Sequence, residues 1–228
     1  MNRISFPPLL LLLLISCHSL PAMIPAPQDT ADMERACRDV FPHRPWRMVH
    51  TITTNLAGRK KGVMIGVVSL SPATGTVECA LLTIEGMRLF EARDDGTLTV
   101  RRALPPFDRP ALAKGMMADI RLLFFQPEGQ PEETGILPGG TPGCRYATEN
   151  GYLDILRTAP GTSRLERYDR RHRLIRRVTI EHCRPAGAEA GERVACHIHL
   201  EALGANGYEL DLDLVEARPA LDNRDEGS

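Results

Sequence analysis

LPPFDRPALAKGMMADIRLLFF, residues 104–125, separates two sets of strand-like patterns in this 228-residue chain. Asp108 is a favourable N-cap for a helix, and Pro110 is tolerated in a first helical turn. Apolar side chains then recur at helical spacing, at Leu112, Met116, Ile120, Leu123 and Phe124. The stretch therefore predicts one helix between two β regions.

The residues before this helix read as β-structure. RMVHTITTNLAG alternates between polar and apolar residues, KKGVMIGVVSL is apolar on both faces, and TVECALLT follows a SPATG turn. GMRLFEA and TLTVRRA then flank the turn Asp94-Asp95-Gly96. Short turns between consecutive strands are typical of an antiparallel meander, here of about five strands.

A second β region follows the helix. Residues 126–143 show no pattern of their own and are expected to form a long loop. GCRYATENGYLDILR predicts a hairpin around Asn150-Gly151. SRLERYD, RLIRRVTIEHC, RVACHIHLEA and GYELDLDLVEA add four strands, which gives about eleven in all. A short helix capped by Asp29 or Thr30 should precede them, with Met33, Cys37 and Val40 on one face.

The N-terminus has the layout of an export signal. The apolar run from Phe6 to Ile15 is too short to span a membrane. Together with the basic residue before it, this run fits a secretory signal. Leu14-Ile15-Ser16-Cys17 resembles a bacterial lipobox, so Cys17 is expected to receive lipid. Ordinary signal cleavage further along and an uncleaved anchor are the alternatives.

These features predict one domain behind a lipid anchor. Residues 1–16 are the predicted signal peptide, 17–28 a Pro-rich tether, 29–217 the domain and 218–228 a polar tail. The near balance of 28 basic and 29 acidic residues gives no reason to expect a nucleic-acid partner. Five cysteines lie beyond Cys17, so at least one must stay unpaired, and the sequence leaves their connectivity open.

The order of these elements resembles the LolA/LolB superfamily of lipoprotein carriers. The similarity is best in LLTIEGMRLFEARDDGTLTV (81–100), and residues 104–125 and GYELDLDL (207–214) are closer to uncharacterised bacterial lipoproteins within that superfamily. The resemblance implies a mainly β fold: an unclosed antiparallel half-barrel with an N-terminal helix and a mid-chain lid helix over a cavity for acyl chains.

Two sets of site residues follow from the resemblance. The lid or cavity set is Leu112, Met116, Met117, Ile120 and Phe124, although ordinary core packing explains the same pattern. The second set is a membrane-facing turn, Ile84-Glu85-Gly86, aligned on the glycine of the LolB insertase turn. Glu85 stands where the insertase has an exposed apolar residue, and a carboxylate would resist entry into hydrocarbon. Ile84 could partly substitute for that residue.

The hairpin HCRPAGAEAGERVACHIH has the residue types of a metal site. Pairing Ile180 with Ile198 and Val178 with Leu200 matches the apolar faces and places Cys183 and Cys196 on opposite faces. This register disfavours a Cys183–Cys196 disulfide unless a bulge intervenes, and it splits the potential zinc ligands. The arginines of residues 164–177 are expected on a solvated face, with anionic head groups as the alternative partner.

The sequence contains no Gly-x-Ser-x-Gly elbow, phosphate-binding glycine loop or His-Glu-x-x-His motif, so neither an enzyme nor a cofactor is expected. The favoured hypothesis is an outer-membrane, periplasm-facing lipoprotein that binds lipid or lipoprotein acyl chains, received from or passed to a carrier protein. The alternative is a structural or assembly lipoprotein with a filled barrel that binds a protein partner. A metal-dependent enzyme is the third hypothesis.

Overall fold

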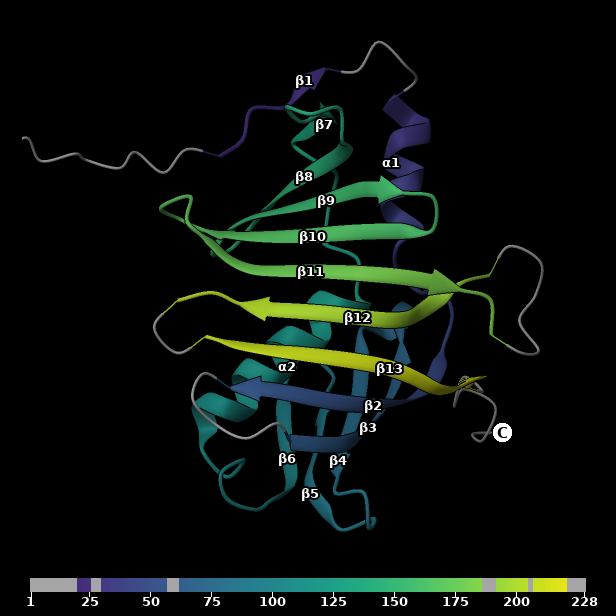
Figure 1. Cartoon of the computed structure of the whole chain (residues 1–228), viewed down its shortest axis with the longest axis vertical. Helices are drawn as coiled ribbons and strands as arrows, with labels where there is room; N and C mark the ends of the chain where they lie inside the picture. The colour runs from purple at the N-terminus through teal and green to yellow at the C-terminus, as the bar shows by residue number, and fades with distance from the viewer. Residues whose placement is uncertain (1–19, 26–29, 57–61, 186–191, 205–206, 221–228) are drawn as a thin grey trace, which may run out of the picture.

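The structure, a computed structural model, describes residues 20–25, 30–56, 62–185, 192–204 and 207–220. Thirteen strands form one antiparallel sheet in the order β1-β7-β8-β9-β10-β11-β12-β13-β2-β3-β4-β5-β6 (Figure 1). β1 and β6 end this order, so the sheet is unclosed, as predicted. The strands are β1 (Ile24–Pro25), β2 (Trp46–Leu56), β3 (Gly62–Ser71), β4 (Thr76–Leu82), β5 (Arg88–Asp94), β6 (Leu98–Ala103), β7 (Glu133–Ile136), β8 (Pro142–Thr148), β9 (Gly151–Ala159), β10 (Thr162–Asp169), β11 (Leu174–Cys183), β12 (Val194–Ala202) and β13 (Tyr208–Pro219).

Eleven of these strands are the predicted ones, and the other two are short. β7 lies inside the expected loop 126–143, and β1 lies inside the expected tether 17–28. Neither segment is long enough to show alternation, so both escape pattern recognition. β13 also extends two residues beyond the predicted domain end at 217.

The last strand joins the two β regions. β13 lies between β12 and β2, with Leu212 opposite both Ile198 and Ile52. The pairing of β13 with β2 therefore joins the two paired strands that lie furthest apart in the sequence.

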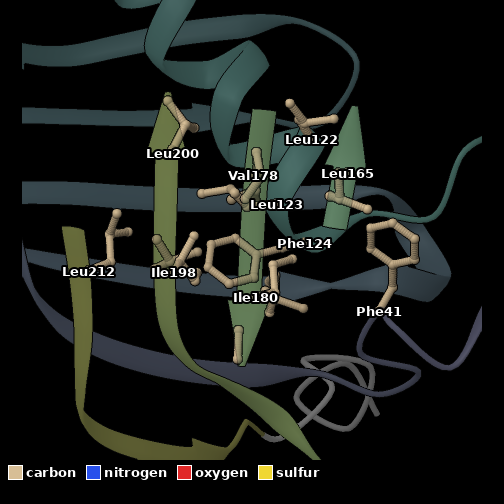
Figure 2. Close-up of a cluster of buried hydrophobic side chains, with 14 of the residues drawn as sticks. Phe41, Leu122, Leu123, Phe124, Leu165, Val178, Ile180, Ile198, Leu200 and Leu212 are labelled. Carbon is tan, nitrogen blue, oxygen red and sulfur yellow. The ribbon is translucent and has the colours of Figure 1, made fainter. Parts of the chain in front are cut away.

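Helix α2 (Pro110–Phe124) packs against the inner face of the bent sheet (Figure 1). Figure 2 shows its apolar end among side chains of four neighbouring strands, including Leu165, Val178, Ile198 and Leu212. The helix begins after Arg109, whose side chain makes no capping bond, so the expected Asp108 cap is wrong. Proline has no backbone N–H, so Pro110 at the first helical position leaves one donor fewer to be satisfied by a side-chain cap.

Helix α1 (Thr30–Arg38) lies against β7, β8 and β9 (Figure 1). Cys37 is fully buried and forms a disulfide with Cys144 of β8, 107 residues away. Met33 packs on the core, and Val40 is buried just beyond the helix, as the predicted face requires. Cys79 is the free cysteine among the described residues, and burial raises the pKa of its thiol to about 11.

A second disulfide joins Cys183 to Cys196, so the prediction that these residues are not bonded is wrong. The predicted pairs Ile180–Ile198 and Val178–Leu200 are present, but the register shifts between Glu181 and His182. This bulge places Cys183 opposite Val194 instead of Ala195. An extra residue in one strand changes which side chains share a face, and here it brings the two sulfurs together.

The N-terminal segment is docked on the edge of the sheet. Ile24 and Pro25 of β1 pair with Ile136 and Gly135 of β7. Arg145 of β8 donates from Nη2 to the Pro21 carbonyl at 2.9 Å. The Arg145 guanidinium also forms a bidentate pair with buried Asp154, with both N–O distances 2.7 Å. Such a fixed guanidinium positions the second N–H of Nη2 for the Pro21 carbonyl, while Nη1 donates to Glu133.

None of the helices in the described ranges is both long and apolar enough to cross a membrane.

Candidate functional site

The predicted lid residues lie on the side of α2 that faces the sheet. Met117 and Phe124 are each only 2% exposed and belong to the main core. Met116 and Ile120 are half-buried and pack against that core, and Leu112 is also half-buried. The structure therefore brings four of the five residues together at the core, with Met117 and Phe124 deepest and Met116 nearer to water, while Leu112 is not part of this cluster.

Apolar packing fills the space between α2 and the sheet. Leu122, Leu123 and Phe124 contribute the last helical turn to one continuous cluster with the strands (Figure 2). His50 of β2 lies under this turn, with its ring centre 6.0 Å from that of Phe124. His50 is 1% exposed and its Nε2 has no hydrogen-bond partner within the described residues. Burial lowers the pKa of His50 to about 4, which keeps the imidazole neutral near pH 7.

One polar contact fixes the middle of α2. Asp119 is buried, and its carboxylate accepts a hydrogen bond from Nε of Arg176 in β11 at 3.0 Å. The Tyr208 hydroxyl at the start of β13 donates to the same carboxylate. The Arg176 guanidinium lies 5.5 Å from the centre of the Tyr208 ring. These three groups from α2, β11 and β13 form the Asp119 cluster.

A second polar contact fixes the other side of α2. Nε of Arg121 donates to Asp94 of β5 at 2.7 Å, and Nη2 donates to the Gly75 carbonyl at 3.1 Å. The Arg121 bond lowers the pKa of the Asp94 carboxyl, so this pair is charged at neutral pH. Sequence periodicity missed Asp94, Asp119 and Arg121, although a charged residue within the apolar stretch 116–125 signals a buried partner.

The turn between β4 and β5 projects apolar side chains into solvent. Ile84 is 64% exposed and Met87 is 54% exposed. Gly86 has a φ of 87° and donates its N–H to the Thr83 carbonyl at 3.0 Å, which closes the turn. Glu85 is exposed, and a hydrogen bond with the Thr83 hydroxyl lowers its pKa. Met87 was not predicted because it was assigned to the strand that follows.

The hairpin residues that suggested a metal site have other partners. Cys183 and Cys196 are bonded to each other. His197 contacts Asp213 at 2.8 Å and His199 contacts Asp211 at 2.6 Å. Within the part of the chain that the structure describes, no three His, Cys, Asp or Glu side chains are grouped to hold a metal ion. Cys17, the predicted site of lipid attachment, lies outside the described residues.

The arginines of residues 164–177 are mostly paired with carboxylates. Arg164 and Arg177 contact Glu166, Arg173 contacts Asp169, and Arg176 belongs to the Asp119 cluster. These contacts give carboxylate partners to four of the seven arginines in this segment, so the basic residues there do not by themselves indicate a ligand.

No family model matches the sequence, and no curated protein is similar to it in sequence. A LolA superfamily protein from Nitrosomonas europaea matches the structure with a TM-score of 0.55 and 11% identity, over 86% of this chain and 96% of that chain. A DUF1329 family protein from Desulfovibrio piger gives a TM-score of 0.46 and 10% identity, over 85% and 94%.

A domain from Vibrio parahaemolyticus, described as an outer membrane lipoprotein-sorting protein, gives a TM-score of 0.41 and 12% identity, over 87% and 94% of the two chains. The fold assignment depends on the Nitrosomonas europaea structure, because the match covers 96% of that chain. A bent, unclosed sheet around α2 is thus the architecture that the sequence resemblance implies, and the chain has the fold of the LolA superfamily.

Proposed function

We propose that this protein is a lipid-anchored component of the bacterial envelope that holds an acyl chain between α2 and the sheet, for transport or outer-membrane localisation of lipids or lipoproteins. The observation that carries the proposal is the placement of α2. It is one helix laid across the inner face of an unclosed sheet, with half-buried Met116 and Ile120 at the border of the apolar core.

The packed interior means that α2 must move to admit cargo. Two ion pairs, one at Asp119 and one at Arg121, attach α2 to the sheet, and the helix could separate from the sheet by breaking them. Buried ion pairs add little net stability compared with apolar packing, and their groups regain hydration when they separate. An acyl chain that replaces the lost contacts gains roughly 0.8 kcal/mol per buried methylene. Binding and release then need no cofactor and no covalent step.

Three features support an envelope location. The N-terminal pattern that ends at Cys17 fits lipid attachment. Two disulfides fit an oxidising compartment outside the cytoplasm. Ile84 and Met87 on an exposed turn could enter a bilayer, while charged Glu85 between them would limit the depth of entry. Handover to or from a carrier protein would then take place at the membrane surface.

A photoreactive fatty acid tests the cavity. We expect it to crosslink to the full chain, purified in nonionic detergent, at residues of α2 and of the facing strands. Met116→Asp should abolish this labelling by placing a carboxylate beside the acyl chain. Ala118→Asp places the same charge on the exposed side of the same helix and should leave labelling unchanged. Labelling spread evenly over surface peptides, or unaffected by Met116→Asp, would exclude the cavity.

The anchor has its own test. Cys17→Ala should remove incorporation of radiolabelled palmitate, since lipoprotein processing needs the modified cysteine. Two or three acyl chains would give stable attachment where one is marginal. Equal incorporation into both forms would contradict the anchor but would leave the cavity proposal standing.

The filled interior also supports a second candidate, an assembly lipoprotein that binds a protein partner on its surface. The continuous core beneath α2 is the observation in its favour. Failure of the full chain to take up any photoreactive acyl chain, with α2 fixed against the sheet, would make this candidate the better one.

A further inference from the structure

A cleft of about 610 Å³ lies at one end of the strands, where the β9–β10 turn meets the segment that follows α1. Residues from the C-terminal end of α1 to Trp46 form one wall, and residues 157–163 form another. His182 of β11, with Glu192 and Arg193 before β12, completes the lining. The cleft is separate from the contact between α2 and the sheet and plays no part in the acyl-chain proposal.

The charges of this cleft do not balance. Arg44 pairs with Glu192, and His43 lies 3.2 Å from Asp39. These contacts occupy both carboxylates of the described lining. Arg157 and Arg193 are exposed, and their guanidinium groups make no ion pair or hydrogen bond with any other described residue. Among the residues that the structure describes, two guanidinium groups of the lining therefore have no carboxylate partner.

His182 belongs to the same lining, and both nitrogens of its ring lie near backbone carbonyl oxygens. Its Nε2 lies 3.0 Å from the Val40 carbonyl oxygen, and its Nδ1 lies 3.4 Å from the Gly161 carbonyl oxygen. A neutral imidazole has one N–H and can donate to only one of these oxygens, whereas the protonated ring donates to both. Burial lowers the pKa of His182, and the positive charges of Arg193 and Arg157 lower it further.

Gly161 brings Arg193 close to the turn. A Cβ built on this glycine would lie only 3.2 Å from Nη1 of Arg193, and its φ of 77° favours glycine. The absence of a side chain lets the Arg193 guanidinium lie against the turn. The position of Arg193 is thus part of the shape of the cleft.

We propose that this cleft binds a phosphate-type oxyanion, with Arg157 and Arg193 as its charged ligands. Guanidinium groups bind phosphate oxygens through paired N–H donors, and they are the favoured residues for this chemistry. The anion supplies the charge that the lining lacks and lowers the cost of protonating His182. Free phosphate and the phosphate of an anionic lipid head group share this chemistry.

The test measures the His182 imidazole by NMR in the full chain, held in nonionic detergent and titrated with sodium phosphate against sodium chloride at equal ionic strength. Phosphate should raise the pKa of His182, and chloride should not. Arg157→Gln combined with Arg193→Gln should weaken phosphate binding at least tenfold. Arg170→Gln combined with Arg171→Gln removes two exposed arginines from the β10–β11 turn, at the opposite end of β10, and should leave binding unchanged.

A second arm separates the two sources of phosphate. Micelles that contain phosphatidylglycerol should reproduce the His182 shift if the head group is bound, while micelles with phosphatidylcholine serve as the control. A shift with inorganic phosphate alone identifies a free anion. No shift with either probe, or an equal shift in the Arg157/Arg193 double variant, would overturn the proposal. Thermal melting without phosphate establishes that each variant is folded.

Discussion

The carboxylate of Asp119 in α2 and the guanidinium of Arg176 in β11 meet at 3.0 Å in a buried position, 57 residues apart in the chain. Tyr208 donates to the same carboxylate, so one side chain of the helix connects two strands that are themselves joined only through β12. The position of α2 along the sheet is therefore set by a polar contact as well as by apolar packing.

Loss of this contact should destabilise the domain. Asp119→Ala leaves Arg176 and Tyr208 without their acceptor, and breaking a buried ion pair costs about 3–5 kcal/mol. We expect the lower end of that range because Arg176 keeps some contact with water. Urea unfolding measures the change. Arg173→Gln, which breaks the exposed pair with Asp169, should cost less than about 1 kcal/mol. Equal losses would show that the Asp119 cluster has no special role.

Met116 and Met117 should respond differently to the same change. Met117→Asp buries an unpaired charge in the core at a cost of several kcal/mol and should unfold the domain. Met116→Asp should leave a folded protein, because the half-buried carboxylate can reach water. Circular dichroism melting distinguishes the two variants. Unfolding of both would assign Met116 to the plain core and weaken the lid interpretation.

The two disulfides should contribute unequally. In the loop-entropy model, a crosslink that closes about 100 residues contributes about 4.7 kcal/mol and one that closes about 15 residues about 3 kcal/mol. Replacing Cys37 and Cys144 by serine should therefore lower the free energy of unfolding more than replacing Cys183 and Cys196. Peptide mapping without reductant should recover both crosslinked pairs and an unmodified Cys79. The reverse order of stability would show that strain or residual structure outweighs loop length.

Stability should fall as the solution is acidified through the range in which His50 titrates in the unfolded chain. Its pKa is about 4 in the folded protein and about 6.5 when exposed, so the unfolded chain binds the extra proton between these values. Stability is complete above about pH 6.5 and is lost toward pH 4. His50→Gln should flatten this part of the profile in urea titrations at several pH values. The lowered pKa of His182 acts in the same direction. An unchanged profile in His50→Gln would mean that the pKa of His50 does not differ between the folded and the unfolded chain.

The β4–β5 turn should contribute to contact with lipid. Ile84→Ser combined with Met87→Ser should reduce flotation of the Cys17→Ala chain with vesicles at least tenfold, since each fully buried side chain of this size contributes about 1.5–3 kcal/mol. Glu85→Gln should increase flotation by removing a charge. Val215→Ser, a matched change at an exposed apolar residue of β13, should have no effect. A similar loss with Val215→Ser would indicate nonspecific adhesion.

Regular alternation made most of this fold predictable. The alternation of polar and apolar residues predicts eleven strands, and apolar residues at helical spacing predict both helices. The family resemblance implied an unclosed sheet with a mid-chain helix, and the structure confirms that architecture, whereas the role of this helix as a lid stays a prediction. The register of the β11–β12 hairpin was correct up to Ile180 and wrong beyond Glu181, since a bulge leaves no trace in the alternation of a strand end.

The site was less predictable because it depends on distant partners. The apolar residues of α2 follow from helical spacing, but Asp119 finds Arg176 and Tyr208 only after the sheet has formed. The same holds for Arg157 of β9 and Arg193, which precedes β12, because both line the cleft only once the sheet has formed. Local patterns carry no information on such contacts.

The docked N-terminal segment would limit the distance between the domain and a membrane if Cys17 carries lipid, as proposed. Arg145 holds the Pro21 carbonyl, and β1 continues the sheet at β7. Between Cys17 and Pro21 the chain advances by four residues, which reach at most about 14 Å when fully extended. With such an anchor, this short tether would keep the domain close to the membrane surface. The protein would then act on the leaflet that holds it and could not cross the periplasm, so any longer journey of its cargo would belong to another carrier.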